Sequence, residues 1–379
     1  MYSNSIRDLA LYIHIPFCKS KCIYCDFLSF ADRESHFDAY FAALFAEIAE
    51  SAAKCGGVPV RSVFIGGGTP SHAGAARIAA LMQRLRTHFR ILPDAEITVE
   101  MNPGTVSADD LKVYKEAGIN RISFGLQSAD NGLLKRLGRI HTYEEFEDAY
   151  MSAEKAGFGN INVDLIFGIP GQTAEQFKHT LESVTALNPQ HISAYSLIVE
   201  PGTKLEEMIS KGLTEEPSDE EDRKMYGLCK KILAEKGYKQ YELSNFAKEG
   251  RECLHNIRYW TGGEYLGLGL GAASLIGGRR FNNTDNFCEY IKGNNVICNE
   301  IELSEEDLMN EFMMLGFRMT DGPSIKLFGE RFGCDYTEKY RVILSDLESR
   351  GLIFKNQSGN YALTEKGLDF GNDVFREFV

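Results

Sequence analysis

Tyr12-Ile-His-Ile-Pro-Phe-Cys18-Lys-Ser-Lys-Cys22-Ile-Tyr-Cys25 places three cysteines within eight residues, directly after an apolar run over residues 9–16 that predicts a buried strand. Thiols at this density are metal ligands or redox groups, because a packed core has no need to cluster them. Three thiolates can hold three irons of a [4Fe–4S] cube and leave the fourth iron for an external ligand. A chain that binds S-adenosylmethionine on iron and cleaves it reductively to a carbon radical needs this geometry.

Two other chemistries remain open at these cysteines. A structural zinc site normally has four protein ligands. Here the fourth would have to come from His14, Asp26 or His36, none of which has the customary finger spacing. A thiol–disulfide motif needs only two cysteines and would leave the third idle. The count of three therefore favours the open iron–sulfur cluster.

Residues 9–200 repeat a pattern in which a short β-branched run is followed by a polar turn and a helical stretch. In the stretch 36–53, apolar residues recur at three- and four-residue steps, as in an amphipathic helix packed on a core. Alternation of strand and helix predicts parallel strands joined by right-handed crossovers. We expect strands over 11–16, 62–65, 97–100, 121–126, 160–167 and 191–199, and helices over 36–53, 71–89, 107–117, 143–156 and 174–187.

Six such units, rather than eight, predict an α/β fold in the form of a partial (β/α)6 TIM-like barrel that is open on one side. A flat doubly wound sheet is the alternative architecture, because strand order cannot be read from one sequence. In both architectures the chemistry lies at the carboxyl ends of the strands. The strands end in turn at Cys18, at the turn Gly66–Pro70, at Glu100 and at Gln127, the fifth carries Asp164, and Arg139 lies beyond the fourth.

The turn Gly66-Gly67-Gly68-Thr69-Pro70 lets a ligand approach the backbone closely, because glycine has no Cβ. It lacks the spacing of a dinucleotide fingerprint and the ending of a P-loop. It is either a simple tight turn or a site for an amino acid moiety. In the second case a backbone carbonyl accepts from the ammonium group, and Thr69 or a free N–H reaches the carboxylate.

The cysteine spacing, the glycine turn and the polar strand ends together resemble radical S-adenosylmethionine proteins. The stretch before Cys18 is similar to one in the family that contains oxygen-independent coproporphyrinogen III oxidase and its relative, the haem chaperone HemW. The resemblance covers nearly the whole chain. It implies a [4Fe–4S] cluster on Cys18, Cys22 and Cys25, and a S-adenosylmethionine site lined by Tyr12, Tyr24, Gly67, Gly68, Thr69, Glu100, Gln127, Arg139 and Asp164.

Two departures favour the chaperone branch of this family. The oxidase carries a further cysteine two residues after the third cluster ligand, where this chain has Phe27. The oxidase also has a long N-terminal extension, for which a first cluster cysteine at position 18 leaves no room. Both features make porphyrinogen decarboxylation the less favoured activity.

The segment His255-Asn256-Ile-Arg-Tyr259-Trp260 matches an H-N-x-x-Y-W signature that the resemblance associates with haem in the chaperone branch. An imidazole is a usual ligand of haem iron, and the two aromatic side chains could pack on a macrocycle. A structural role remains open, in which His255 caps or supports the turn that follows. Haem propionates would find cationic partners in Arg258, Arg279 or Arg280.

The chain of 379 residues carries a formal net charge of −13. This disfavours nucleic-acid binding, because phosphate backbones need neutralising Lys and Arg. Six of the nine cysteines are scattered without framework spacing, and no secretion signal is visible, so we expect a cytoplasmic protein. No apolar run approaches the ~20 residues that span a bilayer, and nothing indicates peripheral membrane contact.

The sequence divides into a barrel over 1–200, a connector and barrel-associated region over 201–300, and a C-terminal domain over 301–379. The last region predicts helices over 304–319, 324–332 and 336–350, then a hairpin and a final helix, in an order that resembles a winged helix. Its nine basic against 15 acidic residues argue against DNA. We expect a lid or a partner-docking module.

Two functions follow as expectations. The first is a binding protein that takes up haem and hands it to a haem-accepting protein, on a scaffold that also binds the cluster and S-adenosylmethionine. The second is oxygen-independent oxidative decarboxylation of coproporphyrinogen III, begun by hydrogen abstraction. Each needs a reductant for the cluster and a haem or porphyrin as its ligand. Because both share the cluster and its pocket, the sequence leaves open whether the protein is an enzyme.

Overall fold

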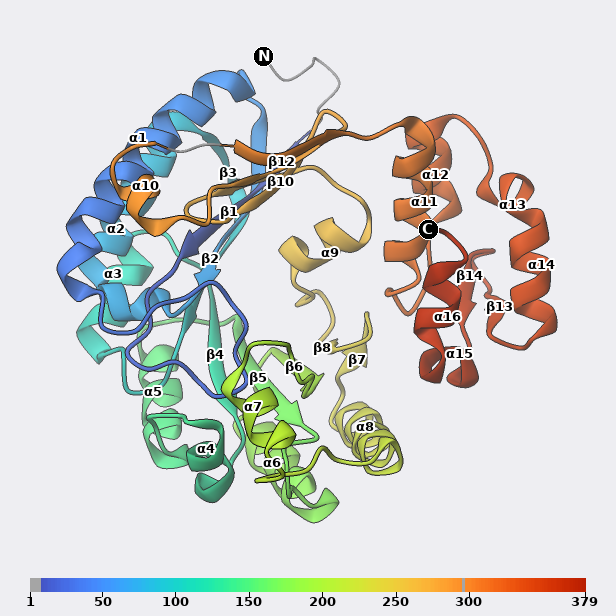
Figure 1. Cartoon of the computed structure of the whole chain (residues 1–379), viewed down its shortest axis with the longest axis horizontal. Helices are drawn as coiled ribbons and strands as arrows, with labels where there is room; N and C mark the ends of the chain where they lie inside the picture. The colour runs from blue at the N-terminus through green and yellow to red at the C-terminus, as the bar shows by residue number, and fades with distance from the viewer. Residues whose placement is uncertain (1–7, 295–296) are drawn as a thin grey trace.

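A computed structural model describes residues 8–294 and 297–379. A curved sheet with helices on its outer side forms the larger part, and the C-terminal helices form a group beside it (Figure 1). Among the described residues the sheet order is β12-β11-β10-β9-β1-β2-β3-β4-β5-β6-β8-β7. This order has two ends that do not pair with each other, so the sheet is a partial barrel and not a closed one.

Six parallel strands follow one another in chain order in the middle of the sheet, which confirms the prediction. Most of their side chains are buried whichever face they point to, because helices cover the outside of the sheet and side chains fill its inside. The strands are β1 (Leu9–Ile15), β2 (Pro59–Gly67), β3 (Arg90–Met101), β4 (Arg121–Gln127), β5 (Ile161–Phe167) and β6 (His191–Ser196).

The helices between these strands pack one apolar face on the sheet. The apolar stripe predicted over 36–53 is buried in α1, and Ser107 begins α3 as a cap whose hydroxyl accepts from the Asp110 N–H. No helix in the described part of the chain combines the length and the apolar character needed to cross a membrane. The helices are η1 (Glu34–His36), α1 (Phe37–Cys55), η2 (Pro70–Ala73), α2 (Ala75–His88), α3 (Ala108–Glu116), α4 (Asn131–Leu137), α5 (Tyr143–Lys155) and α6 (Ala174–Ala186).

The sheet continues beyond the six strands on both sides, which the sequence pattern did not predict in detail. β9 pairs parallel to β1, and β8 pairs antiparallel to β6. These strands are short, and they pair with strands that are distant in the sequence. Their own sequences therefore show little of the periodic pattern from which a strand can be predicted. The elements of this region are α7 (Lys204–Ser210), α8 (Asp219–Glu235), β7 (Lys239–Gln240), β8 (Asn245–Ala247), α9 (Leu254–Trp260), β9 (Tyr265–Leu268), β10 (Ala273–Ile276), β11 (Arg279–Asn283), α10 (Phe287–Ile291) and β12 (Ile297–Glu302).

The C-terminal group packs around an apolar cluster of its own, which includes Phe312, Phe328 and Tyr336. The helix predicted over 336–350 is two helices, because Tyr340 leaves the helical region at φ −103° and ψ 22°. The domain boundaries at 200 and 300 stay predictions. The elements are α11 (Glu305–Gly316), α12 (Ile325–Phe332), α13 (Tyr336–Lys339), α14 (Arg341–Ser349), β13 (Ile353–Lys355), β14 (Tyr361–Leu363), α15 (Glu365–Asp369) and α16 (Gly371–Arg376).

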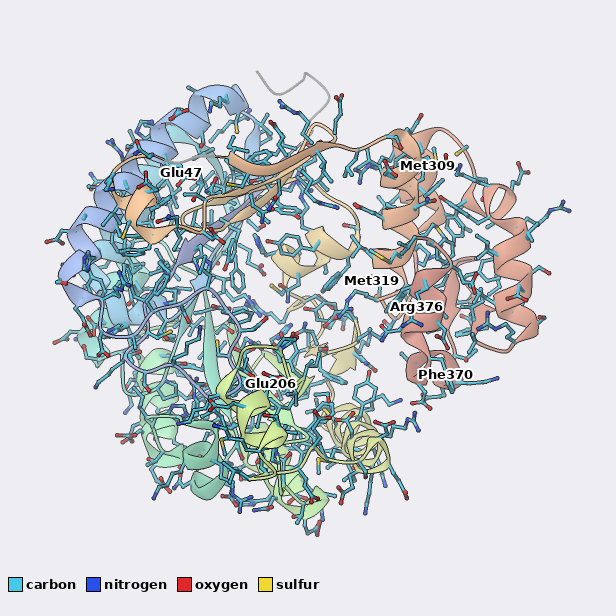
Figure 2. The ribbon with its side chains drawn as sticks, in the orientation of Figure 1. Glu47, Glu206, Met309, Met319, Phe370 and Arg376 are labelled. Atoms are coloured by element: carbon cyan, nitrogen blue, oxygen red, sulfur yellow. The ribbon has the colours of Figure 1, made fainter. Side chains whose placement is uncertain are left out.

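Backbone hydrogen bonds join the C-terminal group to the β7–β8 end of the sheet. The Leu243 N–H donates to the Arg318 carbonyl at 3.1 Å, and the Thr320 N–H donates to the Tyr241 carbonyl at 3.0 Å. Met319, between these two contacts, lies on the side of the C-terminal group that faces the sheet (Figure 2). The two groups therefore meet through a short length of paired backbone.

Candidate functional site

The three clustered cysteines lie on the loop that leaves the carboxyl end of β1. All three are free thiols, of which Cys18 is buried and Cys22 and Cys25 are partly exposed. The Cys18 N–H donates to the Phe30 carbonyl at 2.9 Å, and the Cys25 N–H closes a turn onto the Cys22 carbonyl at 3.3 Å. Backbone hydrogen bonds therefore fix the thiols at one edge of the barrel.

Burial disfavours ionisation of two of these thiols, Cys18 and Cys25. It raises the pKa of the Cys25 thiol to about 11, and it also raises the pKa of Cys18. Two neighbours favour the thiolates: Arg139 Nη1 lies 3.4 Å from Cys22 Sγ, and the Thr69 hydroxyl lies 3.6 Å from Cys18 Sγ. A bound metal supplies the remaining positive charge, since coordinating thiols are deprotonated. Three unpaired thiols beside a cationic group fit an iron–sulfur cluster with one open iron.

A cavity of about 370 Å³ opens directly beside the cysteines. Its walls come from the carboxyl ends of successive strands, so most of the polar residues predicted from those ends meet there. Their roles toward S-adenosylmethionine stay predictions. The predicted residues that line this cavity are Tyr24, Gly67, Gly68, Thr69, Glu100, Gln127, Arg139 and Asp164.

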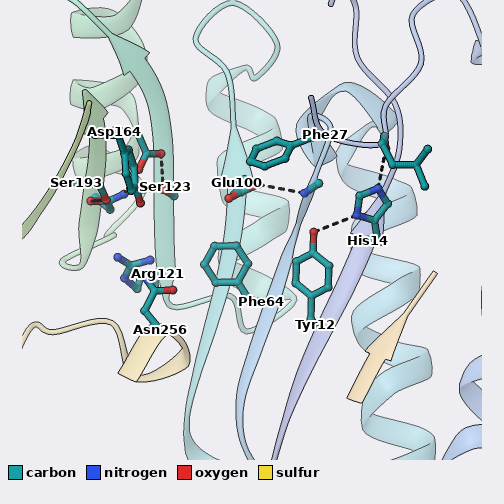
Figure 3. A pocket seen from close by; sticks show the side chains of 14 residues that line it. Tyr12, His14, Phe27, Phe64, Glu100, Arg121, Ser123, Asp164, Ser193 and Asn256 are labelled. Carbon is teal, nitrogen blue, oxygen red and sulfur yellow. Dashed lines mark hydrogen bonds between the residues drawn. The ribbon is translucent and has the colours of Figure 1, made fainter. Parts of the chain in front are cut away.

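Tyr12 is the predicted cofactor residue that the structure places elsewhere. It lines a neighbouring cavity of about 280 Å³ inside the barrel, together with Glu100 and Asp164 (Figure 3). His14 fixes its hydroxyl. The His14 Nε2–H donates to the Leu28 carbonyl at 2.8 Å, so His14 Nδ1 accepts from the Tyr12 hydroxyl at 3.0 Å. The two cavities adjoin, because Gly67, Glu100 and Asp164 line both of them.

The turn after β2 needs glycine for two separate reasons. Gly67 has φ +110°, and a Cβ there would lie 2.6 Å from the His14 ring. A Cβ on Gly68 would lie 2.7 Å from the Phe17 carbonyl oxygen. The approach is this close because the Gly68 N–H donates to the Ile15 carbonyl at 2.9 Å. Glycine therefore ties the turn to the strand that leads to the cysteines.

Arg139 is held by groups that the sequence analysis missed. Its Nη2 donates to Asn102 Oδ1 and to the Gly125 carbonyl. Asn102 in turn donates to the Thr69 hydroxyl at 2.9 Å. The Arg139 Nε is buried and has no partner among the described residues, so the guanidinium retains a donor for a ligand. The available signal was the polar Asn102 two residues after Glu100, where the same strand ends.

Gln127 adopts a backbone conformation that is uncommon for a residue with a side chain. Its φ is +74°, and the pairing register of β4 with β5 shifts between Gly125 and Gln127. Such strained positions concentrate at ligand-binding sites, where surrounding structure holds them. The sequence analysis also missed other lining residues of the 370 Å³ cavity, which include Ser123, Tyr195 and Ile198.

Glu100 and Asp164 are two partly buried carboxyl groups that line both cavities. Burial and, second, the charge of Asp164 raise the pKa of Glu100 to about 8. Burial also raises the pKa of Asp164, against hydrogen bonds from Ser123 and Asn162 at 2.9 Å each. Glu100 is therefore a neutral acid near pH 7 that can donate a hydrogen bond to a ligand.

Glu100→Gln is expected to make unfolding of the apoprotein less dependent on pH. The Glu100 pKa is higher in the folded chain than its ordinary value of 4.5, so the carboxyl favours folding fully below pH 4.5 and progressively less as the pH rises through about 8. The melting temperature of the parent should fall across this window, and that of the variant should fall less. The exposed Glu116→Gln provides the control. Parallel curves for the parent and Glu100→Gln would contradict the raised pKa.

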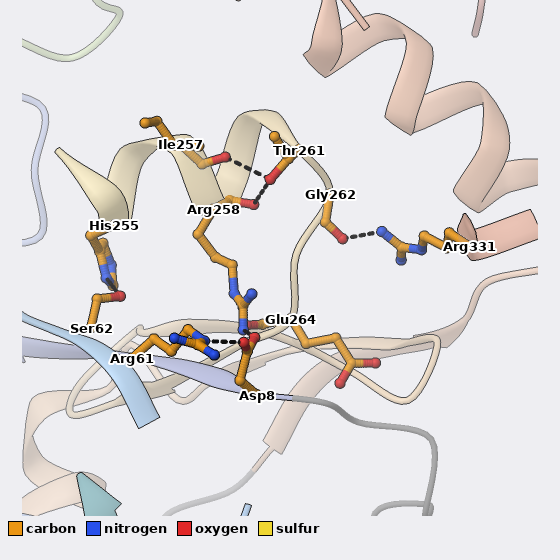
Figure 4. A network of polar contacts seen from close by, with 10 residues as sticks. All are labelled: Asp8, Arg61, Ser62, His255, Ile257, Arg258, Thr261, Gly262, Glu264 and Arg331. Carbon is orange, nitrogen blue, oxygen red and sulfur yellow. Dashed lines mark hydrogen bonds and ion pairs between the residues drawn. The ribbon is translucent and has the colours of Figure 1, made fainter. Parts of the chain in front are cut away.

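His255 of the H-N-x-x-Y-W segment is enclosed by its neighbours. Its Nδ1 is hydrogen-bonded to the Ser62 hydroxyl at 3.0 Å (Figure 4). Its Nε2 is hydrogen-bonded to the Tyr259 hydroxyl at 3.0 Å. Its ring stacks on Phe64 with centroids 5.1 Å apart, and burial lowers the pKa of His255 to about 3. In this structure neither ring nitrogen is free for iron.

The other residues of this segment face two different cavities. Asn256 lines the 280 Å³ cavity inside the barrel. Tyr259 and Trp260 line a third cavity of about 320 Å³, whose opposite wall is α11 and α12 of the C-terminal group. Arg331 of α12 spans the gap and donates to the Gly262 carbonyl (Figure 4). The structure thus does not gather the four predicted haem residues around one ligand.

Known proteins are similar to this chain in both fold and sequence. Residues 12–184 match the radical SAM superfamily, and residues 303–370 match the HemN C-terminal domain. The haem chaperone HemW of Bacillus subtilis (strain 168) is 38% identical over 97% of this chain and 98% of its own length. HemW of Escherichia coli (strain K12) is 35% identical over 99% of each chain. The solved structure of coproporphyrinogen III oxidase (HemN) from Escherichia coli has a TM-score of 0.85 at 26% identity, over 98% of this chain and 90% of that one.

A partial barrel with three free cysteines after its first strand, and with polar strand ends around them, defines a radical SAM protein. The superfamily implies a [4Fe–4S] cluster and S-adenosylmethionine as cofactors, and the thiols and polar groups described above fit both. Within this class the chain belongs to the HemW family, and it is 38% and 35% identical to the members from Bacillus subtilis and Escherichia coli over nearly its whole length.

Proposed function

We propose that this protein takes up haem and transfers it to a recipient protein, on a scaffold that also holds a [4Fe–4S] cluster and S-adenosylmethionine. The observation that carries the proposal is the similarity to curated haem chaperones at 31–38% identity. Phe27 adds support, because it stands where the resemblance gives the oxidase a cysteine. The phenyl ring is 63% exposed and lines both the 370 and the 280 Å³ cavities. A phenyl group has no thiol hydrogen or lone pair to contribute to chemistry there.

Cys18, Cys22 and Cys25 would hold the cluster, which supplies one-electron reducing power when bound. Around it we assign roles to this chain's own groups. The free donor of Arg139 suits the carboxylate of S-adenosylmethionine. Glu100 and Asp164 suit its hydroxyl and ammonium groups. The remaining residues of the site would be Gly67, Gly68 and Thr69 at the methionine part, with Tyr24 and Gln127 beside them and Tyr12 in the adjoining cavity.

We place the haem against Tyr259 and Trp260, in the 320 Å³ cavity, rather than on His255. Aromatic side chains from both groups line this cavity and suit a flat macrocycle. Trp260 Nε1 is buried there without a partner among the described residues. Arg280, which contacts both carboxylate oxygens of Glu311 at 2.6 Å, and Arg331 could pair with propionates. The lining residue Met314 offers a thioether, a known haem-iron ligand.

Two protein partners complete the proposed function. A haem-accepting protein would receive the cargo, and a reductant would supply the electron that the cluster needs. We propose the cytoplasm as the place of both steps, because free thiols persist in a reducing compartment.

Anaerobically reconstituted protein is expected to bind haem stably and to leave coproporphyrinogen III unchanged. The test supplies haem and coproporphyrinogen III separately, the latter with S-adenosylmethionine and dithionite. A persistent Soret band without formation of protoporphyrinogen supports the chaperone function. Formation of protoporphyrinogen with repeated turnover would contradict the chaperone function and support the oxidase function instead.

A matched pair of variants locates the haem in the same experiment. Trp260→Leu should weaken haem binding about tenfold, because it removes an aromatic surface worth ~1.5 kcal/mol against a macrocycle. Phe354→Leu, which removes an exposed aromatic ring of β13, should leave the affinity unchanged. If His255→Ala loses the Soret band and Trp260→Leu keeps it, the result would contradict the proposed haem position. The His255 imidazole would then be the ligand of the haem iron.

A further inference from the structure

Asn102 lies between the two groups that contact cysteine sulfurs of the candidate cluster site. It directly follows β3 and lines the 370 Å³ cavity. On one side its Oδ1 accepts from Arg139 Nη2, and Nη1 of the same guanidinium lies 3.4 Å from Cys22 Sγ. On the other side its Nδ2 donates to the Thr69 hydroxyl at 2.9 Å, and that hydroxyl lies 3.6 Å from Cys18 Sγ. One amide side chain therefore connects both sulfur contacts.

The direction of the Asn102 amide follows from its neighbours. A guanidinium has donors and no acceptor, so only the amide oxygen can make the contact with Arg139. The amide nitrogen then faces Thr69 and donates to its hydroxyl. The hydroxyl oxygen accepts this bond with a lone pair, so its one proton is left for another acceptor. Among the described residues that acceptor is the sulfur of Cys18, which is buried, as is Thr69.

The surroundings of Asn102 hold the amide in this place. The Asn102 carbonyl accepts from the Thr105 N–H at 3.1 Å and from the Thr105 hydroxyl at 2.7 Å. The next residue is Pro103, which restricts the backbone of the residue before it. Gly125 leaves room for the guanidinium, since a Cβ there would lie 2.9 Å from Asn102 Oδ1 and 3.2 Å from Arg139 Nη2. Both the backbone and the side chain of Asn102 are therefore fixed.

Hydrogen bonds to the sulfurs of an iron–sulfur cluster change how readily the cluster accepts an electron. Reduction adds negative charge to the cluster and its thiolates, so a donor aimed at a sulfur stabilises the reduced state more than the oxidised state. The reduction potential rises as a result. The Thr69 hydroxyl and the Arg139 guanidinium are such donors, at two of the three clustered cysteines. A residue that aims both donors can set the potential without contacting the cluster.

We propose that Asn102 is a positioning residue that raises the reduction potential of the cluster. It acts through two donors, because it turns the Thr69 proton onto Cys18 and holds Arg139 beside Cys22. The inference rests on the proposed cluster at the three clustered cysteines. The reaction that it governs is the transfer of one electron from the external reductant to the cluster, in which no bond forms or breaks.

The first test removes the Thr69 hydroxyl from the cluster-loaded protein, in the absence of S-adenosylmethionine. The readout is the ratio of reduced to oxidised cluster at one fixed solution potential, measured from the electron paramagnetic resonance of the reduced form. Thr69→Val should lower this ratio about tenfold, because it removes a hydrogen bond to a charged sulfur. Thr69→Ser keeps the hydroxyl, and its ratio should stay within about twofold of the parent value.

Asn102→Asp separates the orientation of the hydroxyl from the contact with Arg139. Aspartate still accepts from the guanidinium, but it has no donor, so the Thr69 hydroxyl turns to the carboxylate and away from Cys18. In the Asn102→Asp background, Thr69→Val should therefore change the ratio less than about twofold. The charge added by aspartate is present in both members of this comparison and cancels.

An equal loss from Thr69→Val in both backgrounds would overturn the proposal, since the two residues would then act independently. An unchanged ratio in Thr69→Val alone would also overturn it. Gly125→Ala provides a second approach, because its Cβ would displace the amide oxygen of Asn102 and should lower the ratio. A ratio at the parent value in this variant would contradict the positioning role.

The failure of this inference differs from the failure of the proposed function. A cluster that assembles in the parent and keeps its potential in all the variants overturns the role of Asn102 alone. A parent that assembles no cluster overturns the cluster assignment, and this inference with it. Haem binding is measured separately by the Soret band and decides the chaperone function in either case.

Discussion

Replacing Cys22 with serine is expected to abolish the brown absorbance of the reconstituted [4Fe–4S] cluster. A serine hydroxyl is a poor ligand for iron in this oxidation range, and the two remaining thiolates leave half of the cube unsupported. Cys22 has no nearby substitute in the loop, because the other two thiols occupy the remaining ligand positions. Iron and acid-labile sulfide per chain, measured after anaerobic reconstitution, should fall by more than tenfold.

Cys288→Ser gives the control for this change. Cys288 is exposed on α10 and does not line the 370 Å³ cavity beside the three cysteines, so its loss should leave iron and sulfide at the parent level. Full cluster absorbance in Cys22→Ser would contradict the three-thiolate site. Tetrahedral zinc at these cysteines in protein purified without air would contradict the iron–sulfur assignment itself.

Gly68→Ala is expected to destabilise the protein by ~1–3 kcal/mol and to abolish S-adenosylmethionine binding. The added Cβ would meet the backbone of Phe17, 2.7 Å from its oxygen and 2.8 Å from its nitrogen, where no side chain can turn aside. Either the turn or the strand that leads to Cys18 must shift. Chemical denaturation measures the first effect, and calorimetric titration of the cluster-loaded variant measures the second.

Gly227→Ala is the matched control because its new Cβ meets nothing within 4 Å. Gly227 lies in the middle of α8, so alanine should stabilise the protein by ~0.5–1 kcal/mol through its better helix propensity. Equal changes in the free energy of unfolding of the two variants would show that the close approach of Gly68 to the Phe17 backbone does not affect stability.

The barrel could be predicted from the sequence because its signals are local. β1, β4 and β5 are short and largely apolar runs, and the helices α3, α5 and α6 each carry an apolar stripe and a capping box. The strands added on both sides could not be predicted in the same way. β7 and β8 have two and three residues, and their identity depends on partners that only the folded chain brings near.

Site residues that directly follow a strand end could be predicted from the sequence. Residues whose role depends on the direction in which the side chain points were harder to predict. Tyr12 lies in β1 before the loop, so the pleat turns it into the barrel beside His14, where it lines the 280 Å³ cavity and not the adjoining cysteine cavity. In α9, His255 and Tyr259 are one turn apart and contact each other. Trp260 projects toward the C-terminal group instead. A sequence motif does not specify where each side chain points, because that depends on how its helix or strand packs in the fold.

The 320 Å³ cavity has one wall from the sheet and α9 and the other from α11 and α12, which pack around a separate apolar cluster. Its width therefore depends on how these two groups are oriented and on the Arg331–Gly262 and Arg280–Glu311 contacts that bridge its walls. A rotation about the paired backbone at Leu243 and Thr320, with release of Arg331 from Gly262 and of Arg280 from Glu311, would open it while both hydrophobic interiors stayed intact. Haem in the position proposed above would then leave without any part of the protein unfolding.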